Sequence, residues 1–190
     1  PRDASVDVVT VEPLVFDVTS SSIGVSFDYD RVAGQIIQSW SSLVTPEITI
    51  ASFEAKPEVV KSDIEPIIDR LPNVFENGRL DINYIDPHTK QEYTWYVSLE
   101  EMSDWIEVQR KEGNGFVFGL KMASTTEFLE GDIADFVNIE PHDAKFQIGT
   151  NGKVVEFQGS RPGVGVDVEG TYKAINDAVI ERTLHDEGVT

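Results

Sequence analysis

The chain reads GVSFDYDRVAGQIIQSWSSL at residues 24–43 and GVGVDVEGTYKAINDAVIER at residues 163–182, and the two stretches align without a gap. They are identical at four positions: a glycine, a valine and an aspartate near the start, and an isoleucine in the middle. Apolar residues recur in both at helical spacing, which predicts helices over residues 29–43 and 168–184. A recurrence at fixed spacing indicates tandem modules.

Each stretch predicts a strand that turns into a helix at an aspartate. The carboxylate of Asp28 or Asp167 can accept a hydrogen bond from the first turn and meets the positive end of the helix dipole. A glycine stands four positions earlier, where close packing of strand and helix favours a residue without a side chain. We therefore expect four structural corners in the repeat: Gly24, Asp28, Gly163 and Asp167.

The repeat extends towards the amino terminus of both stretches. The sequence PRDA at residues 1–4 and PHDA at residues 141–144 each lead into alternating apolar residues, which predict hairpins over residues 4–18 and 144–157. The second hairpin has an Asn-Gly pair, which accepts the positive φ angles of a tight turn. This part of the alignment needs one inserted residue.

The middle of the chain contains three Ser-x-x-Glu patterns, which predict helix starts at Ser62, Ser98 and Ser124. Residues 79–85 and 92–97 predict a further hairpin between the first two of these helices.

Strands are also expected at residues 48–53 and 116–120, and the strands and helices do not alternate regularly as in a parallel doubly wound sheet. The expected class is α+β, with β-hairpins packed with short helices and a tandem repeated hairpin–helix unit. We expect residues 1–56 to be the later part of a first copy and residues 57–190 to be a second, nearly complete copy.

Composition restricts the function classes. The 190 residues are 40% hydrophobic and carry a formal charge of −19, which repels nucleic acids and anionic lipid headgroups. The absence of cysteine excludes thiol catalysis and disulfides. No apolar run approaches the length of a membrane span, so we expect no membrane insertion. The start at Pro1 suggests a segment of a longer or processed polypeptide, with any anchor elsewhere.

No motif predicts catalysis, a cofactor or a metal site. The third glycine of a dinucleotide fingerprint would fall at Val168. The histidines His88, His142 and His185 stand far apart, without zinc-type spacing. No nucleophile elbow or Ser-x-x-Lys pair occurs. We therefore expect a non-enzymatic chain with no catalytic residue.

Aromatic residues are the candidates for ligand binding. Tyr93 and Trp95 share one side of a predicted strand, Tyr96 points to the other, and Trp105 follows on the next helix. Sugar rings stack on such faces, although core packing explains at least part of this set. Arg161 could meet an anionic group or form a surface salt bridge. The candidate ligand-binding residues are thus Tyr93, Trp95, Trp105 and Arg161.

The sequences IEPHDA at residues 139–144, NGKV at 151–154 and GVGVD at 163–167, followed by a helix, resemble the peptidoglycan-binding module of VanW-like bacterial surface proteins. The same module precedes the catalytic domain of some L,D-transpeptidases. The resemblance covers about residues 97–185 as one nearly whole copy and residues 1–56 as the later part of a preceding copy. The Ser-His-Gly-Cys motif of the transpeptidases is absent.

The resemblance implies a non-catalytic module at the bacterial cell surface, which binds peptidoglycan or another cell-wall component, or spaces a neighbouring domain from the membrane. It transfers no ligand contact, because the shared positions are structural. Two alternatives stay open: an accessory domain that positions substrate for an L,D-transpeptidase, and a protein-protein adhesin module.

Overall fold

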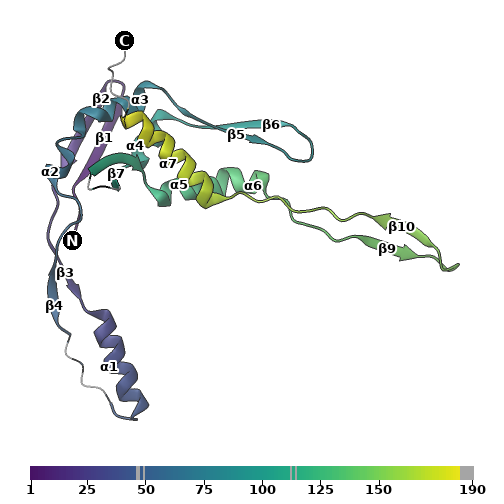
Figure 1. The fold of residues 1–190 in the computed structure, drawn as a ribbon, viewed down its shortest axis with the longest axis horizontal. Helices are drawn as coiled ribbons and strands as arrows, with labels where there is room; N and C mark the ends of the chain where they lie inside the picture. Colours follow the sequence, from purple (N-terminus) through teal and green to yellow (C-terminus); the bar gives the residue numbers. More distant parts are fainter. Residues whose placement is uncertain (46–47, 49, 112, 114, 185–190) are drawn as a thin grey trace. The chain divides into compact units, whose positions relative to one another are not determined.

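A computed structural model describes residues 1–45, 48, 50–111, 113 and 115–184 (Figure 1). The chain divides into two compact units, the first formed by Pro1–Asp69 with Val108–Phe116 and the second by Arg70–Glu107 with Val117–Thr190. In the described residues, the strands form five two-stranded sheets, each joining neighbours in the chain order of strands. Mixed helices and local strand pairs confirm the predicted α+β class.

The first unit consists of a hairpin, a helix between two paired strands, and a short helix. Strand β3 pairs with β4 in antiparallel fashion, from Gly24 opposite Ala55 to Phe27 opposite Ser52. In chain order, its elements are β1 (Ser5–Val11), β2 (Leu14–Thr19), β3 (Gly24–Phe27), α1 (Tyr29–Ser41), β4 (Ser52–Ala55) and α2 (Lys61–Ile64).

The residues before β1 fasten the segment that precedes α2. Oδ1 of Asp3 accepts hydrogen bonds from the amides of Glu58 (2.6 Å) and Val59 (3.2 Å), and the amide of Ala4 donates to the carbonyl of Val59 (2.9 Å). The buried apolar side chains of this unit come from the same two regions: Ala4, Val6, Val59, Ile64 and Ile67. The first hairpin and the α2 region therefore bury their apolar residues within one unit.

The second unit is mainly helical. A 3-10 turn, η1 (Ile68–Arg70), lies where the two units divide, and the hairpin of β7 (Ile106–Lys111) and β8 (Gly115–Leu120) has its base in the second unit and its tip in the first. The remaining elements are α3 (Leu71–Glu76), β5 (Leu80–Ile85), β6 (Glu92–Val97), α4 (Leu99–Trp105), α5 (Met122–Phe128), the π-helical turn η2 (Leu129–Ile133), α6 (Ala134–Val137), β9 (Lys145–Ile148), β10 (Val154–Gln158) and α7 (Val168–Leu184).

Helix α7 packs against α3, α5 and η2. Its residues Ile175 and Val179 are buried, one turn apart on the same face. The buried Asn176 accepts a hydrogen bond from the amide of Leu120 (2.7 Å), and the hydroxyl of Tyr172 donates to the carbonyl of Leu120 (3.0 Å). These bonds satisfy both main-chain groups of Leu120 at the end of β8 and hold the first half of the helix there.

Arg182 joins the end of α7 to the residues after α3. Its guanidinium donates to the carbonyl oxygens of Val74 (3.1 Å), Gly78 (2.7 Å) and Arg79 (3.2 Å). Burial lowers the pKa of Arg182 from its usual value. The three carbonyl groups include acceptors that the carboxyl end of a helix leaves without intrahelical partners.

The two hairpin–helix copies share their corner geometry. Isolated antiparallel bridges join Arg2 to Ser22 in the first copy and His142 to Arg161 in the second. A side chain at Gly24 would collide with Pro1, and one at Gly163 would collide with Pro141 and with the carbonyl of Ile139. Each glycine therefore allows the proline that opens its copy to lie directly against it.

The aspartates at the corners cap the helices that follow. Oδ1 of Asp28 accepts from the amide of Arg31 at 2.9 Å, and Oδ1 of Asp167 accepts from the amide of Gly170 at the same distance. Helix α7 has the predicted bounds, whereas α1 ends two residues before the predicted end.

The Ser-x-x-Glu prediction is right for one helix of three. Ser98 and Glu101 form a capping box at α4. Helix α2 instead begins after Val60, because the Val60 amide donates to the Asp63 carboxylate and caps the helix before Ser62 is reached; Ile64 of this helix is buried. Ser124 lies inside α5, which begins at Met122.

Two strands also differ from the prediction. The strand expected at residues 48–53 is observed as β4, which starts four residues later and ends two residues later than predicted, because its pairing with β3 sets its extent; residue 49 lies outside the described residues. Strand β7 was not predicted.

Candidate functional site

A cavity of about 190 Å³ lies in the second unit between the β5–β6 hairpin, the π-helical turn and the corner before α7. Trp95, a predicted ligand-binding residue, lines it together with Asp167, a predicted corner. Its lining includes the aromatic residues Tyr84 and Trp95 and the polar residues Asp167 and Thr171. The cavity therefore combines ring faces with hydrogen-bonding groups.

The register of the β5–β6 hairpin brings its apolar and aromatic side chains to one face. Ile82 pairs with Trp95, and Tyr84 pairs with Tyr93. Directly opposed residues on antiparallel strands point to the same side, as do residues two apart on one strand. The shared face therefore carries three aromatic rings.

Phe136 of α6 completes this group, and we call Tyr84, Tyr93, Trp95 and Phe136 the aromatic cluster. The Phe136 ring meets the Tyr93 ring edge to face at 4.7 Å and the Trp95 ring at 5.5 Å, while Tyr84 stacks on Tyr93 at 6.3 Å. The hairpin rings are half-buried, but Phe136 is 53% exposed. The cluster thus packs α6 against the hairpin and still offers an open ring.

The hydroxyl of Tyr84 is the least satisfied polar group of the cavity lining. The oxygen is buried, and it has no hydrogen-bond partner among the described residues. Burial, followed by the nearby carboxylate of Asp86, raises the pKa of Tyr84 from its usual value, so the hydroxyl keeps its proton. A buried hydroxyl without a partner can donate to an acceptor group of a ligand at little further desolvation cost.

The corner before α7 supplies the polar edge of the cavity. The Asp167 carboxylate accepts a hydrogen bond from the amide of Gly170, and Oδ1 of Asn138 accepts one from the amide of Val166 (3.0 Å). These bonds fix the backbone that lines the cavity. Asp167 can use its other carboxylate oxygen as an acceptor because a carboxylate has several acceptor positions.

The opposite face of the β5–β6 hairpin has a different character. Tyr96 lies there, 57% exposed, with the guanidinium of Arg79 4.5 Å from its ring centre. Nε of Arg79 also donates to Oδ1 of Asp81 at 2.9 Å. Tyr96 is therefore separated by the sheet from the aromatic cluster.

The structure places the other two candidate ligand-binding residues outside the aromatic cluster. Trp105 is buried, and its ring lies 5.5 Å from that of Phe128. It lines a second hollow together with acidic residues, including Glu101 and Asp104. Arg161 is exposed on the segment between β10 and α7. Tyr93 and Trp95 are thus brought together, whereas Trp105 and Arg161 lie elsewhere.

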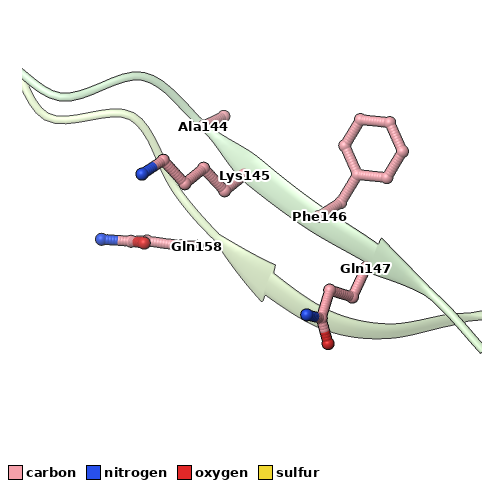
Figure 2. Close-up of a pocket in the computed structure, with 5 residues that line it drawn as sticks. All are labelled: Ala144, Lys145, Phe146, Gln147 and Gln158. Carbon is pink, nitrogen blue, oxygen red and sulfur yellow. The ribbon is translucent and has the colours of Figure 1, made fainter.

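A third hollow, of about 520 Å³, lies along the β9–β10 hairpin (Figure 2). Its lining residues are exposed. Lys145 pairs with Gln158, and in Figure 2 their side chains extend from one side of the hairpin, whereas Phe146 extends from the other. The hairpin therefore has one polar and one apolar face, and no motif in its sequence predicted a site there.

The described part of the chain offers neither a membrane-spanning helix nor a cluster of metal ligands. Its helices include none that is long and apolar enough to cross a bilayer. Its histidine, aspartate and glutamate side chains form no group of three or more that could hold a metal ion.

Comparison with known families identifies the part of the chain that forms α4 to α7. Residues 100–185 match the family described as "Putative peptidoglycan binding domain". This match spans a little under half of the chain and confirms the resemblance to a peptidoglycan-binding module over these residues. The narrower resemblance to VanW-like proteins or L,D-transpeptidases stays a prediction. No curated protein and no solved structure matches the chain.

The matched residues contribute one side of the cavity. Asp167 and Thr171 belong to the match, as do the π-helical turn and α6. Tyr84 and Trp95 precede it on the β5–β6 hairpin. The cavity is therefore built from residues of the matched range and from a hairpin before it. Phe136, which sequence reasoning missed, lies inside the match, but a lone phenylalanine on a four-residue helix gives no periodic signal.

Proposed function

We propose that this chain binds peptidoglycan without catalysing a reaction, as a module on the outer surface of a bacterial cell. The observation that carries the proposal is the family match, because residues 100–185 supply one side of the cavity beside the aromatic cluster. The proposal includes an anchor or further domain elsewhere in the parent protein.

The chemistry of the cavity suits one projecting group of a glycan or its peptide. Sugar rings have apolar C–H faces that pack on aromatic rings, and Trp95 offers such a surface. The Tyr84 hydroxyl can donate to an amide carbonyl, and Asp167 can accept from a hydroxyl or amide. A volume of about 190 Å³ is smaller than the roughly 300–1,000 Å³ of drug-sized ligand sites. It therefore fits an acetamido group or one ring edge better than a disaccharide.

The net charge sets the expected salt dependence. A chain with a charge of −19 is repelled by polyanionic wall polymers. Salt screens this repulsion over a distance of about 10 Å at 0.1 M. Binding to cell walls that retain such polymers should therefore increase with salt, whereas binding to purified peptidoglycan should depend on salt less.

Co-sedimentation of the full chain with purified sacculi tests the proposal. We expect the chain to pellet with the sacculi and Trp95→Ala to lose at least about tenfold in apparent affinity, the equivalent of one good aromatic contact. Tyr96→Ala is the matched control, because it removes an aromatic ring from the opposite face of the same strand pair. Circular dichroism checks that both variants fold. A wild-type chain that stays wholly in the supernatant contradicts the proposal.

A second candidate function is protein-protein contact, including the spacing of a neighbouring domain. Large apolar side chains are exposed away from the aromatic cluster, on α1 and on the β9–β10 hairpin. Exposed apolar patches mark interaction surfaces. Deletion of the first hairpin–helix copy, which contributes no residue to the cavity, would change the reach of the parent protein under this candidate and would leave sacculus binding unchanged.

A role beside an L,D-transpeptidase is a further alternative. A Ser-His-Gly-Cys motif in the same polypeptide would favour it, and a VanW-type domain there would contradict it.

A further inference from the structure

The β9–β10 hairpin presents an apolar face with nothing from the described residues covering it. Phe146 pairs with Phe157, and Ile148 pairs with Val154. Residues two apart on β9 share a face, so the four side chains form one surface, which we call the hairpin face. Each of them is more than half exposed, up to 72% for Phe157. A surface of this kind on a small hairpin predicts an interaction.

The equivalent face of the β1–β2 hairpin is covered. Val6 pairs with Val18, and Val8 pairs with Phe16, so this hairpin repeats the pairing of β9 with β10. Val6 is only 5% exposed, and the other three side chains are half-buried. The first unit therefore shows how a hairpin of this repeat is buried: beside the segment and helix that follow β4, where Val59, Ile64 and Ile67 are also buried.

The polar contacts that fasten the first hairpin also have counterparts in the second copy. Asp3 and Ala4 bind the main chain of Glu58 and Val59. Asp143 and Ala144 occupy the same positions of the PHDA sequence, and both are exposed. The second hairpin thus carries the residues that fasten a following segment, placed beside an uncovered apolar face.

Helix α1 gives an independent observation at the other end of the repeat. It has no buried residue, and Ile37 and Trp40 are about two-thirds exposed. In α7, Val179 stands at the position of Trp40 and is fully buried, since α3, α5 and η2 cover that helix. The second unit therefore shows what covers a helix of this repeat.

We propose that the hairpin face and α1 are docking surfaces for further hairpin–helix units of the same architecture, joined in tandem. The hairpin face binds the following unit through a segment equivalent to residues 57–67, with Asp143 accepting from its main-chain amides. Helix α1 binds a group of helices in a preceding unit that is equivalent to α3, α5 and η2. Each unit then contacts only its neighbours, as in repeat proteins.

A separate second copy of this chain does not offer the same sites. Its Glu58 and Val59 are already bound by its own Asp3 and Ala4, and its α3, α5 and η2 are already covered by its own α7. The occupant is therefore a unit in the same polypeptide. This inference does not involve the aromatic cluster, so it goes beyond the proposed peptidoglycan site and can fail independently of it.

Hydrogen exchange on a lengthened chain tests the inference. Residues 1–184 followed directly by residues 46–190 place a second copy of the α2 region after α7, in the same order as after α1. The lengthened chain contains β9 and β10 twice, and only the first copy is followed by an added α2 region. We expect the amides of that first copy to exchange at least about tenfold more slowly than the same amides of the 190-residue chain, and those of the second copy to exchange as fast as in the 190-residue chain. Slow exchange in both copies of α7 shows that the added unit is folded.

Variants of the lengthened chain locate the contact. In the first of the two copies, Phe146→Ser and Asp143→Ala should each restore fast exchange of that β9–β10 hairpin. Lys145→Ala in the same copy, on the polar face in Figure 2, should leave its exchange slow. The proposal is overturned if the first β9–β10 hairpin of the lengthened chain exchanges as fast as the hairpin of the 190-residue chain while the added unit is folded. Protection that instead appears when the 190-residue chain is concentrated assigns the face to a second copy and also overturns it.

Discussion

The two hairpin–helix copies differ in which part is covered. In the first copy, the hairpin is fastened to the α2 region and the helix α1 has no buried residue. In the second copy, the helix α7 is covered by α3, α5 and η2, and the hairpin face is exposed. The corner glycines and capping aspartates are the same in both. Local sequence therefore sets the shape of the unit, and distant segments of the chain decide which side of it is buried.

The largest expected effect is a difference in the free energy of unfolding between matched substitutions in α7 and α1. Ile175→Ala removes a buried side chain of α7 and should lower the free energy of unfolding by about 2–4 kcal/mol. Ile36→Ala, at the aligned position of α1, should cost less than about 1 kcal/mol, because no residue of α1 is buried. Urea unfolding followed by circular dichroism measures both. Equal losses would mean that α1 is buried as well as α7.

Arg182→Leu should have the next largest effect, since it removes the donor of three hydrogen bonds to carbonyl groups. We expect a loss of about 1–3 kcal/mol. Leu43 holds the aligned position after α1 and is 95% exposed, so Leu43→Arg should change stability by less than about 0.5 kcal/mol. Thermal unfolding of the two variants gives the comparison, and an Arg182→Leu variant as stable as the wild type would contradict it.

The sequence predicted the features that depend on neighbouring residues. The bounds of α7 follow from a capping aspartate and a regular apolar repeat, and the Ser98 box lies directly before α4. Ser62 and Ser124 fit the same pattern, but α2 begins before Ser62, where the Val60 amide donates to Asp63, and α5 begins at Met122, two residues before Ser124.

The candidate site was predictable only in part, for the same reason. Period two placed Tyr93 and Trp95 on one face, as the β5–β6 register shows. Phe136 and the unpartnered Tyr84 hydroxyl depend on how α6 packs against the hairpin, and no local pattern reports that contact. The apolar alternation of both hairpins is similar in sequence, so it could not show that only one of them is covered.

The hairpins give a smaller contrast than the helices. Val6→Ser should cost about 1–3 kcal/mol, because it places a hydroxyl among buried apolar side chains. Phe146→Ser, at the equivalent position of the second copy, should stay within about 0.5 kcal/mol in the 190-residue chain. Chemical denaturation measures both, and a large loss for Phe146→Ser would show that the hairpin face is covered in this chain.

The smallest effect concerns the turns of two hairpins. The amides of Thr89 and His88 donate to the Asp86 carboxylate and lower its pKa below the usual 3.8. The ionised carboxylate therefore stabilises the folded β5–β6 turn at pH values above the usual pKa of an aspartate. This contribution is lost as the pH falls through the lowered pKa of Asp86. Asn151 makes the corresponding bond to the amide of Lys153 in the β9–β10 turn and does not titrate.

Nuclear magnetic resonance distinguishes the two turns. The amide signals of residues 88 and 89 should shift between about pH 5 and pH 2, and that of residue 153 should shift much less. Asp86→Asn should abolish the shift at residues 88 and 89. Signals at those residues that stay constant with pH in the wild type would show that the carboxylate does not hold the turn.

Hydrogen exchange of the 190-residue chain tests most directly whether one repeated unit is covered on opposite sides in its two copies. We predict slow exchange in the β1–β2 hairpin and in α7, and fast exchange in the β9–β10 hairpin and in α1. Slow exchange in α1 matching that of α7, or in β9–β10 matching that of β1–β2, would contradict the account.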